Sequence, residues 1–356
     1  MENLGLTRLQ ILPGPILITG HTGFKGTWLT LALESMGIST IGYSLRPSNE
    51  SLYTRLNRFN RIDEIFCDIT DFESLSNFII KNKPSAIIHL AAQPLVLQSY
   101  ENPLETFNVN VMGTANVLEA ARQNSFVQYI VAATTDKVYK NSEKLLKFKE
   151  ADPLEGKDPY SASKVGAESV IRAWQNLSES EGGANISAVR SGNVIGGGDF
   201  SKDRIVPDII RSYISRDKLV VRNPHSTRPW QHALDPLFGY LQVLDSQISN
   251  SIRNENFNFG PSEKSLPVQA IVDIAFSVLG QDRLRVEYGA DETKYEATNL
   301  ELESTKAGRL LNWTPALTQH EAIKQTFVWW KKVLSEDIDE LAACYHDIDL
   351  FRTKYL

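Results

Sequence analysis

A short apolar run followed by evenly spaced glycines constrains the fold of this chain more than any other feature. Ile16-Leu-Ile-Thr19 is typical of a buried strand. Directly after it come Gly20, Gly23 and Gly26, and a helical stretch follows. Glycines at such a turn let the backbone approach a pyrophosphate, which then lies against the positive N-terminus of the helix. The turn therefore predicts a dinucleotide site, although its GxxGxxG spacing differs from the commoner GxGxxG.

Short apolar segments alternate with helical segments through the first half of the chain. We expect strands at 16–19, 39–44, 62–67, 86–90, 127–133 and 185–189, and helices at 24–36, 72–81, 103–123 and 160–175. This alternation predicts an α/β fold, a Rossmann-type doubly wound parallel sheet with helices on both faces. After about Arg190 the alternation decays. We therefore expect a dinucleotide-binding domain over 10–190, which segments at about 230–260 rejoin. A smaller mixed substrate domain is expected over 191–356.

Composition excludes several classes of protein. A net charge of -6 over 356 residues argues against a nucleic-acid partner, because a polyanion prefers a basic surface. The first apolar run is too short for a signal or membrane segment. Cys67 and Cys344 are the two cysteines, and six histidines show no metal-ligand spacing. We expect a cytoplasmic protein with no disulfide framework, no metal and no membrane contact.

The ends of the second and third strands bear on the choice of cofactor. Gly42-Tyr-Ser-Leu-Arg46 carries no acid where an NAD-selective site usually holds the ribose hydroxyls. Ser44 and Arg46 could instead receive a 2′-phosphate, and a solvated arginine explains Arg46 equally well. Asp68 follows the third strand and could lie near the adenine, or could cap the next helix.

Tyr160 and Lys164 are four residues apart, so on a helix their side chains share one face. An ammonium group beside a phenol stabilises the phenolate and lowers its pKa from the usual value of about 10. The pair predicts a base that takes a hydroxyl proton as hydride leaves the same carbon. Thr135, about 25 residues earlier, supplies the hydroxyl that such a site needs.

Asp136 and Lys137 follow Thr135 directly, at the expected end of an apolar strand. Hydride transfer alone does not need an extra acid and an extra amine, whereas the removal of water needs both kinds of proton-transfer group. Ligands bind at the carboxyl ends of parallel strands, which favours a catalytic role. The alternative is a solvated loop with two opposite charges.

Arginine, asparagine and aromatic residues recur after the first six strands. They are Arg190, Asn193, Arg204, Arg222, Asn223, His225, Arg228 and Trp230. Arginine suits bidentate phosphate recognition, and tryptophan can stack on a base or a sugar. In an acidic chain this set indicates a nucleotide diphosphate ligand, although any single member could be an ordinary surface residue.

A series of strings from residue 16 to about 315 carries a family resemblance. They are Ile18-Thr-Gly-His-Thr-Gly-Phe-Lys-Gly26, His89-Leu-Ala-Ala-Gln-Pro-Leu-Val96, Asn110-Val-Met-Gly-Thr114, Thr135-Asp-Lys137, Tyr160-Ser-Ala-Ser-Lys164, Ser191-Gly-Asn-Val-Ile-Gly-Gly-Gly-Asp199, Arg204-Ile-Val-Pro-Asp208, Arg222-Asn-Pro-His225, Arg228-Pro-Trp-Gln-His232 and Asn258-Phe-Gly-Pro261. On these strings the chain resembles the extended short-chain dehydrogenases/reductases. Within them it looks like the branch of CDP-glucose 4,6-dehydratases.

The resemblance implies two sets of binding residues. The cofactor is expected to be NAD rather than NADP, held by Gly20, Thr22, Gly23, Phe24, Lys25, Gly26, Asp68, Ile69, Leu90, Ala91, Ala92, Asn110, Tyr160 and Lys164. The substrate is expected to be a small nucleotide-sugar, held by Gln93, Thr135, Asn193, Arg204 and Arg228. A homodimer built through the helices at 103–123 and 160–175 is also implied, and further pairing into a dimer of dimers stays open.

The resemblance also implies a reaction. Tyr160, assisted by Lys164 and with Thr135 holding the hydroxyl, accepts a proton as C4 of the glucose is oxidised. Asp136, with a pKa raised by burial, protonates the departing C6 oxygen, and Lys137 removes the C5 proton. The product is a 4-keto-6-deoxy sugar. A nucleotide-sugar 4-epimerase, or a dehydratase acting on another nucleotide-hexose, are the alternatives.

Overall fold

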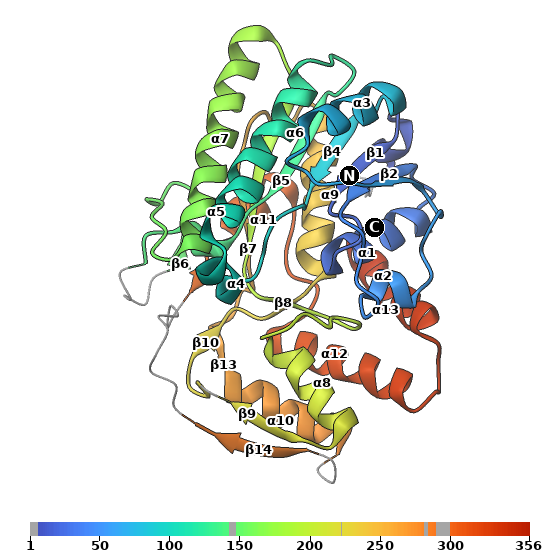
Figure 1. Cartoon of the computed structure of the whole chain (residues 1–356), viewed down its shortest axis with the longest axis vertical. Coiled ribbons are helices and arrows are strands. Elements are labelled where there is room, and N and C mark those ends of the chain that lie inside the picture. The colour runs from blue at the N-terminus through green and yellow to red at the C-terminus, as the bar shows by residue number, and fades with distance from the viewer. Residues whose placement is uncertain (1–5, 142–146, 222, 281–283, 290–299) are drawn as a thin grey trace.

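The computed structural model describes residues 6–141, 147–221, 223–280, 284–289 and 300–356. Seven strands form one parallel sheet: β1 (Ile16–Thr19), β2 (Thr40–Ser44), β3 (Asp63–Phe66), β4 (Ala86–His89), β5 (Tyr129–Ala133), β7 (Asn185–Ser191) and β12 (Phe257–Phe259). Their order across the sheet is β12-β7-β5-β4-β1-β2-β3, and every neighbouring pair is parallel. The doubly wound Rossmann-type sheet expected from the sequence is confirmed (Figure 1).

Helices cover both faces of this sheet. One face packs on α3 (Phe72–Asn82), α6 (Gly113–Arg122) and α7 (Pro159–Glu181); the other packs on α1 (Phe24–Ser35), α9 (Leu234–Ile248) and α13 (Glu340–Tyr355). Alternate strand residues face opposite ways, so Leu17 and Ile87 join the first layer while Ile18 and Ile88 join the second. Both faces are therefore buried, which explains why the strands are apolar throughout.

Two of the expected helices differ in detail from the structure. The stretch at 103–123 is divided into α5 (Pro103–Phe107), a π-helical turn η2 (Asn108–Met112) and α6. Helix α7 is longer than expected: Asp158 and Ser161 form a capping box at its start, and it continues to Gly182, whose φ of 75° ends it. Tyr160 is the second residue of α7, so the capping box fixes the position of Tyr160 in the first turn of the helix.

A smaller part lies below the sheet in Figure 1. It contains α8 (Ile205–Ser215), β9 (Lys218–Val221) paired with β14 (Arg285–Tyr288), α10 (Val268–Leu279) and α12 (Gln319–Leu334). The chain enters this part after β7, returns to the sheet with α9 and β12, leaves again, and ends with α13 against α1 and α9. The cleft between the two parts is consequently lined by several separate chain segments.

The remaining elements are short. They are η1 (Thr7–Ile11), α2 (Leu52–Arg55), α4 (Val96–Glu101), η3 (Asp136–Val138), β6 (Lys147–Phe148), β8 (Val194–Ile195), β10 (Thr227–Arg228), β11 (Gln231–His232), β13 (Leu266–Pro267), β15 (Glu301–Leu302) and α11 (Thr305–Leu311). Among the described residues, no helix combines the length and the apolar character that crossing a lipid bilayer requires.

Candidate active site

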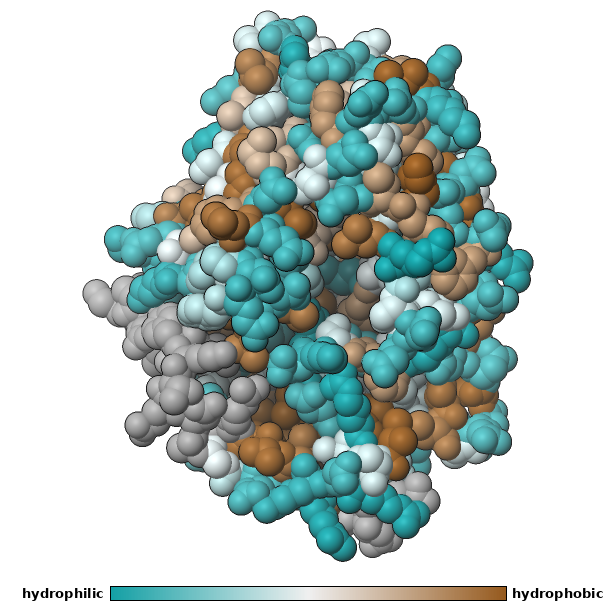
Figure 2. All heavy atoms as spheres, in the orientation of Figure 1, coloured by the Kyte–Doolittle hydropathy of each residue, from teal (hydrophilic) through white to brown (hydrophobic). Residues whose placement is uncertain are grey.

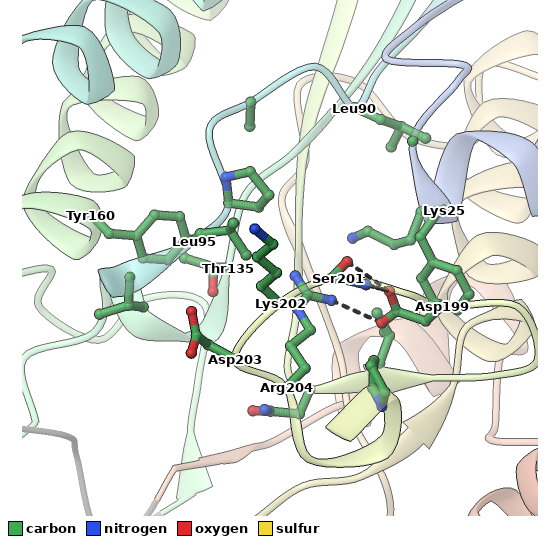
Figure 3. Close-up of a pocket in the computed structure, with 18 of the residues that line it drawn as sticks. Lys25, Leu90, Leu95, Thr135, Tyr160, Asp199, Ser201, Lys202, Asp203 and Arg204 are labelled. Carbon is green, nitrogen blue, oxygen red and sulfur yellow. Dashed lines mark hydrogen bonds and ion pairs between the residues drawn. The ribbon is translucent and has the colours of Figure 1, made fainter. Parts of the chain in front are cut away.

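A cavity of about 700 Å³ lies between the carboxyl edge of the sheet and the smaller part. Figure 2 shows the hollow near the middle of the molecule, and Figure 3 shows Lys25, Thr135, Tyr160 and Arg204 lining the same space. Most residues expected at the site line this cavity: Gly20, Thr22, Gly23, Phe24, Lys25, Gly26, Asp68, Ile69, Leu90, Ala91, Ala92, Thr135, Asp136, Lys137, Tyr160, Asn193, Arg204 and Arg228. The fold therefore gathers segments that are up to about two hundred residues apart in the chain.

The glycine turn has the shape of a phosphate cradle. Gly20 has a φ of 74°, and a Cβ there would lie 2.8 Å from the backbone nitrogen of Ala91. A Cβ on Gly26 would lie 2.1 Å from the carbonyl oxygen of Gly20. Gly23 is the N-cap of α1 and has no side chain that could accept a hydrogen bond from the first turn. The first N–H groups of α1 are therefore not capped by a side chain, and they lie at the cavity wall. A dinucleotide pyrophosphate fits this arrangement of donors.

The second and third strands contribute polar groups beside the same turn. The hydroxyls of Thr22 and Ser44 are 2.7 Å apart, and the guanidinium of Arg46 stacks over Phe66. Asp68 lines the cavity, and its Oδ1 accepts hydrogen bonds from the backbone and the hydroxyl of Thr70. The alternative that Asp68 caps the next helix is wrong, because that N-cap is Asp71.

The end of β5 turns directly into the cavity. The Thr135 hydroxyl accepts a hydrogen bond from the Lys137 backbone N–H and donates one, 3.0 Å long, to Asp136 Oδ1. Asp136 is 2 % exposed, and its Oδ2 has no hydrogen-bond partner among the described residues. Burial raises the pKa of this carboxyl, against the opposing effect of Lys137. The raised pKa of Asp136 expected from the sequence is thus confirmed.

Tyr160 and Lys164 lie side by side on the first turns of α7, as their spacing predicts. The ammonium of Lys137 lies 5.9 Å from the centre of the Tyr160 ring. The Lys164 amine donates to the carbonyl of Ala133 over 3.5 Å, and burial lowers its pKa to about 8, with Lys25 adding to the effect. The three reactive groups, Tyr160, Asp136 and Lys137, therefore surround one space.

The expected direction of the Tyr160 pKa is wrong for this structure. Burial raises it to about 12, and a hydrogen bond with Thr135 opposes that rise without cancelling it. The charges that act on Tyr160 are those of Asp136 and Asp158, which raise its pKa, and of Arg204, which lowers it; Lys164 is not among them. Burial is therefore the dominant effect on this phenol.

Cationic side chains face the cavity beyond the reacting groups, Lys202 of the loop before α8 among them. Three more were expected from the sequence. They are Lys25, Arg204 and Arg228, and Arg204 forms an ion pair of 3.5 Å with Asp199. Burial, with a smaller contribution from the charge of Arg204, lowers the pKa of Lys25 to about 8. Carboxylates such as Asp199 and Asp203 line the same cavity, so the cations there are not unopposed. The two guanidinium groups can still pair with a diphosphate.

Some expected residues lie elsewhere. The Gln93 side chain binds Leu95 and Thr106, and the Asn110 amide binds the Gln93 backbone and the Ser163 hydroxyl, so both lie outside the cavity lining. Lys164 lies behind Tyr160 and is also outside the lining.

The arginine and asparagine set divides in the same way. Arg190 is fully buried and holds Glu168, which corrects its assignment to a phosphate cluster. Asn223 and Trp230 line the cavity, whereas His225 is exposed and does not. Arg222 lies outside the described residues.

Sequence analysis missed the loop between β8 and α8. Asp199, Ser201, Lys202 and Asp203 all line the cavity, and the Ser201 hydroxyl donates to Asp199 (Figure 3). Asp203 has a φ of 58°, an uncommon conformation for a residue other than glycine. The run of three glycines before this loop is the sequence signal that could have found it, because it indicates an irregular connection that can reach a ligand.

Comparison with known proteins identifies the family. A family model described as GDP-mannose 4,6 dehydratase matches residues 17–326. The chain belongs to this family. It is 40 % identical to a CDP-glucose 4,6-dehydratase of Salmonella typhimurium strain LT2 over 324 residues, which cover 89 % of this chain and 90 % of that protein.

Solved structures share the fold. A dTDP-glucose 4,6-dehydratase of Streptomyces venezuelae with NAD bound has a TM-score of 0.77 at 22 % identity, covering 92 % of this chain and 99 % of that one. An epimerase of Methanothermobacter thermautotrophicus has a TM-score of 0.80 at 22 % identity, with coverages of 94 % and 97 %. Both dehydratases and epimerases thus use this architecture, so the site must decide between them.

We expect Asp136→Asn to stabilise the protein. A carboxyl with a raised pKa costs the folded state stability once the pH exceeds the unfolded value, because its charge is then desolvated on folding. The Tm of the variant should therefore exceed that of the native chain at about pH 8, and the difference should nearly vanish at about pH 3, below the unfolded pKa of about 3.9, where the carboxyl is mostly protonated in both states. Differential scanning fluorimetry measures both values.

The matched control is Asp349→Asn, at an acid whose side chain is 71 % exposed. It should leave the Tm unchanged at both pH values. A native chain more stable than Asp136→Asn at about pH 8 would contradict the raised pKa.

Proposed function

We propose that this protein is an NAD-dependent CDP-glucose 4,6-dehydratase, which converts CDP-glucose into CDP-4-keto-6-deoxy-glucose and water. One observation carries the proposal: the buried Asp136, with its free Oδ2, and Lys137 both lie at the cavity beside Tyr160. An enzyme that only oxidises and reduces a sugar has no use for this acid and this amine. The relative from Salmonella typhimurium supports the reaction and the nucleotide.

The first step is oxidation at C4. NAD, when bound, supplies the hydride acceptor for C4 and later the hydride donor for C6. Tyr160 takes the proton of the C4 hydroxyl while Thr135 holds that hydroxyl by a hydrogen bond. Lys164 stabilises the phenolate form of Tyr160 from behind, so the proton that Tyr160 accepts can be relayed out of the site.

The second step removes water across C5 and C6. A ketone at C4 acidifies the C5 hydrogen, and Lys137 takes it as a proton. Asp136 gives a proton to the C6 oxygen, which leaves as water. The raised pKa of Asp136 keeps this carboxyl protonated closer to neutral pH than an ordinary aspartic acid. Hydride returned to C6, and a proton returned to C5, complete the product.

Polar and cationic side chains of the cleft are available to bind the substrate. Arg204 and Arg228 reach the cavity from the smaller part, and Asn193 reaches it from the end of β7. We assign these three side chains to the diphosphate and its attached sugar, because guanidinium groups pair with phosphate oxygens in two-point contacts. The cytidine assignment rests on the relative alone.

The decisive experiment is incubation of the protein with CDP-glucose and NAD, followed by mass spectrometry and absorbance of the nicotinamide. We expect a sugar nucleotide lighter by one water and no net accumulation of NADH. A product of unchanged mass would indicate a 4-epimerase instead. Conversion of another nucleotide-hexose in place of CDP-glucose would retain the chemistry and correct the nucleotide.

Separate variants test the two elimination residues. Lys137→Met should abolish incorporation of solvent deuterium at C5, because no amine then removes that proton. Asp136→Asn should allow this exchange and still lower product formation by ~10²–10⁴-fold, since the C6 oxygen lacks its acid. Proton NMR of the sugar in D₂O measures the exchange. Undiminished exchange in Lys137→Met would remove Lys137 from the base role.

We also propose that the protein is a cytoplasmic homodimer. Helices α5 and α7 pack together, and the surface around them exposes Leu104 (86 %), Met112 (52 %), Phe107 (41 %) and Leu177 (38 %). Large apolar side chains exposed on adjacent elements are typical of a protein interface. Both cysteines are unpaired, as is usual in a reducing compartment.

Replacing Leu104 with Arg should therefore weaken the dimer. A charge in the centre of an apolar interface is left without a partner, so the variant should elute as a monomer where the native chain elutes as a dimer. Size-exclusion chromatography with light scattering measures the mass. Ile11→Arg, at a side chain 74 % exposed on η1, is the control and should leave the dimer intact. A native chain that is monomeric would end this proposal.

A further inference from the structure

We propose that Glu168 is a positioning residue for the oxidation step: it holds the end of β5 against α7 and supplies a negative charge that strengthens the hold of Lys164 on its proton. This inference rests on the proposed function, because it assigns work to Glu168 within the same reaction. Glu168 does not line the cavity and is buried, with 4 % exposure. Its effect must therefore reach the substrate through other residues.

The carboxylate of Glu168 is fixed from three directions. Its Oε1 accepts a hydrogen bond of 2.5 Å from the Thr134 hydroxyl and one of 2.7 Å from Arg190 Nε. Its Oε2 accepts one of 2.7 Å from Arg190 Nη2. This is a bidentate ion pair between side chains that are 0 % and 3 % exposed. Such a pair has a single geometry, and a rigid carboxylate is what positioning requires.

The contact with Thr134 connects this carboxylate to the reacting groups. Thr134 stands between Ala133, whose carbonyl accepts from Lys164, and Thr135, whose hydroxyl belongs to the oxidation step. Helix α7 carries Tyr160, Lys164 and Glu168 at intervals of four residues. One hydrogen bond thus sets the strand that carries Thr135 against the helix that carries the base.

Arg190 extends the support to the far side of the site. Its Nη1 donates to the Tyr139 hydroxyl over 2.7 Å, and that hydroxyl donates to Asn258 Oδ1 over 2.7 Å. Tyr139 directly follows the turn η3, which bears Asp136 and Lys137. The network therefore joins β5, α7, β7 and β12 around one carboxylate. Loss of Glu168 would remove hydrogen bonds that position all four elements.

The charge of Glu168 also acts on Lys164, one helical turn away. The titratable groups around Lys164 are Lys25 from α1, His89 at the end of β4, and Tyr160 and Glu168 on α7 itself. Burial and Lys25 lower the pKa of Lys164 to about 8, and Glu168 opposes them. His89 is buried between the hydroxyls of Thr19 and Thr114, and burial lowers its pKa to about 3, so it stays neutral.

A coupled pair of groups makes this charge measurable. The active form of the site carries one proton, on Lys164, while Tyr160 is a phenolate; the competing form has the same proton on Tyr160. The oxidation rate rises with pH until the first proton of the pair has left, and then reaches a plateau. A lower proton affinity of Lys164 moves the increase of the oxidation rate to lower pH and lowers the rate at the plateau. It leaves the rate at acidic pH unchanged.

The test uses Glu168→Gln, which keeps the shape and removes the charge. With NAD and CDP-xylose, a sugar that has a C4 hydroxyl but no C6 to lose, NADH formation reports oxidation alone. In Glu168→Gln we expect the midpoint of the increase in oxidation rate to lie about one pH unit lower than in the native chain, and the plateau rate to be about tenfold lower. At acidic pH the two proteins should have equal rates. Glu168→Asp keeps the charge but shortens the reach to Thr134. This variant should have a lower oxidation rate at every pH, with the midpoint of the pH profile unchanged.

Glu179→Gln, farther along α7 at an exposed position, is the control and should match the native profile. An unchanged rise in Glu168→Gln overturns the proposal. If that variant does not fold, Glu168→Gln with Arg190→Met removes both charges of the pair, and the same downward shift is expected. Failure of the native chain to oxidise any nucleotide-sugar would instead defeat the proposed function, so the two failures are distinct.

Discussion

A parallel sheet that is buried on both faces leaves the ends of its strands as the place where polar groups can gather, and the site depends on this constraint. Strands β1, β4, β5 and β7 end at the same edge, where no helix covers them. Each then delivers one part of the site: the glycine turn, the Leu90-Ala91-Ala92 wall, the Thr135-Asp136-Lys137 turn, and Asn193. The chemistry is located at this edge because the apolar layers on both faces exclude it from everywhere else.

Desolvation is the second property that the site depends on. It raises the pKa of Asp136 and of Tyr160, and it lowers the pKa of Lys25 and of Lys164. Each shift disfavours a charge in the folded state, so the cavity is held in an electrostatically costly arrangement by the packing around it. For Asp136 and Lys164 the shifts are towards neutral pH, where proton transfer is most efficient, whereas the shift of Tyr160 is away from it.

Much of this was accessible from the sequence. Periodicity located all six expected strands, and the glycine turn and Tyr160 line the cavity as expected, whereas Lys164 lies outside its lining. The π-helical turn at 108–112 was not accessible, because its extra residue serves the contact of Asn110 with Gln93, which is made across the fold. The prediction that Arg190 binds phosphate was wrong for a similar reason. The sequence does not show whether a guanidinium binds a phosphate or, as here, the carboxylate of Glu168.

The sequence by itself determined which groups are available and in which order they appear: a glycine turn, a Thr-Asp-Lys turn, a Tyr-Lys pair and a set of arginines. Local spacing encodes these features, since strands and helices have fixed periods. Only the tertiary structure decided which side chains meet, which charges are desolvated, and therefore in which direction the pKa of Tyr160 moves. Those properties depend on atoms contributed by distant segments, and no local pattern records how closely they approach.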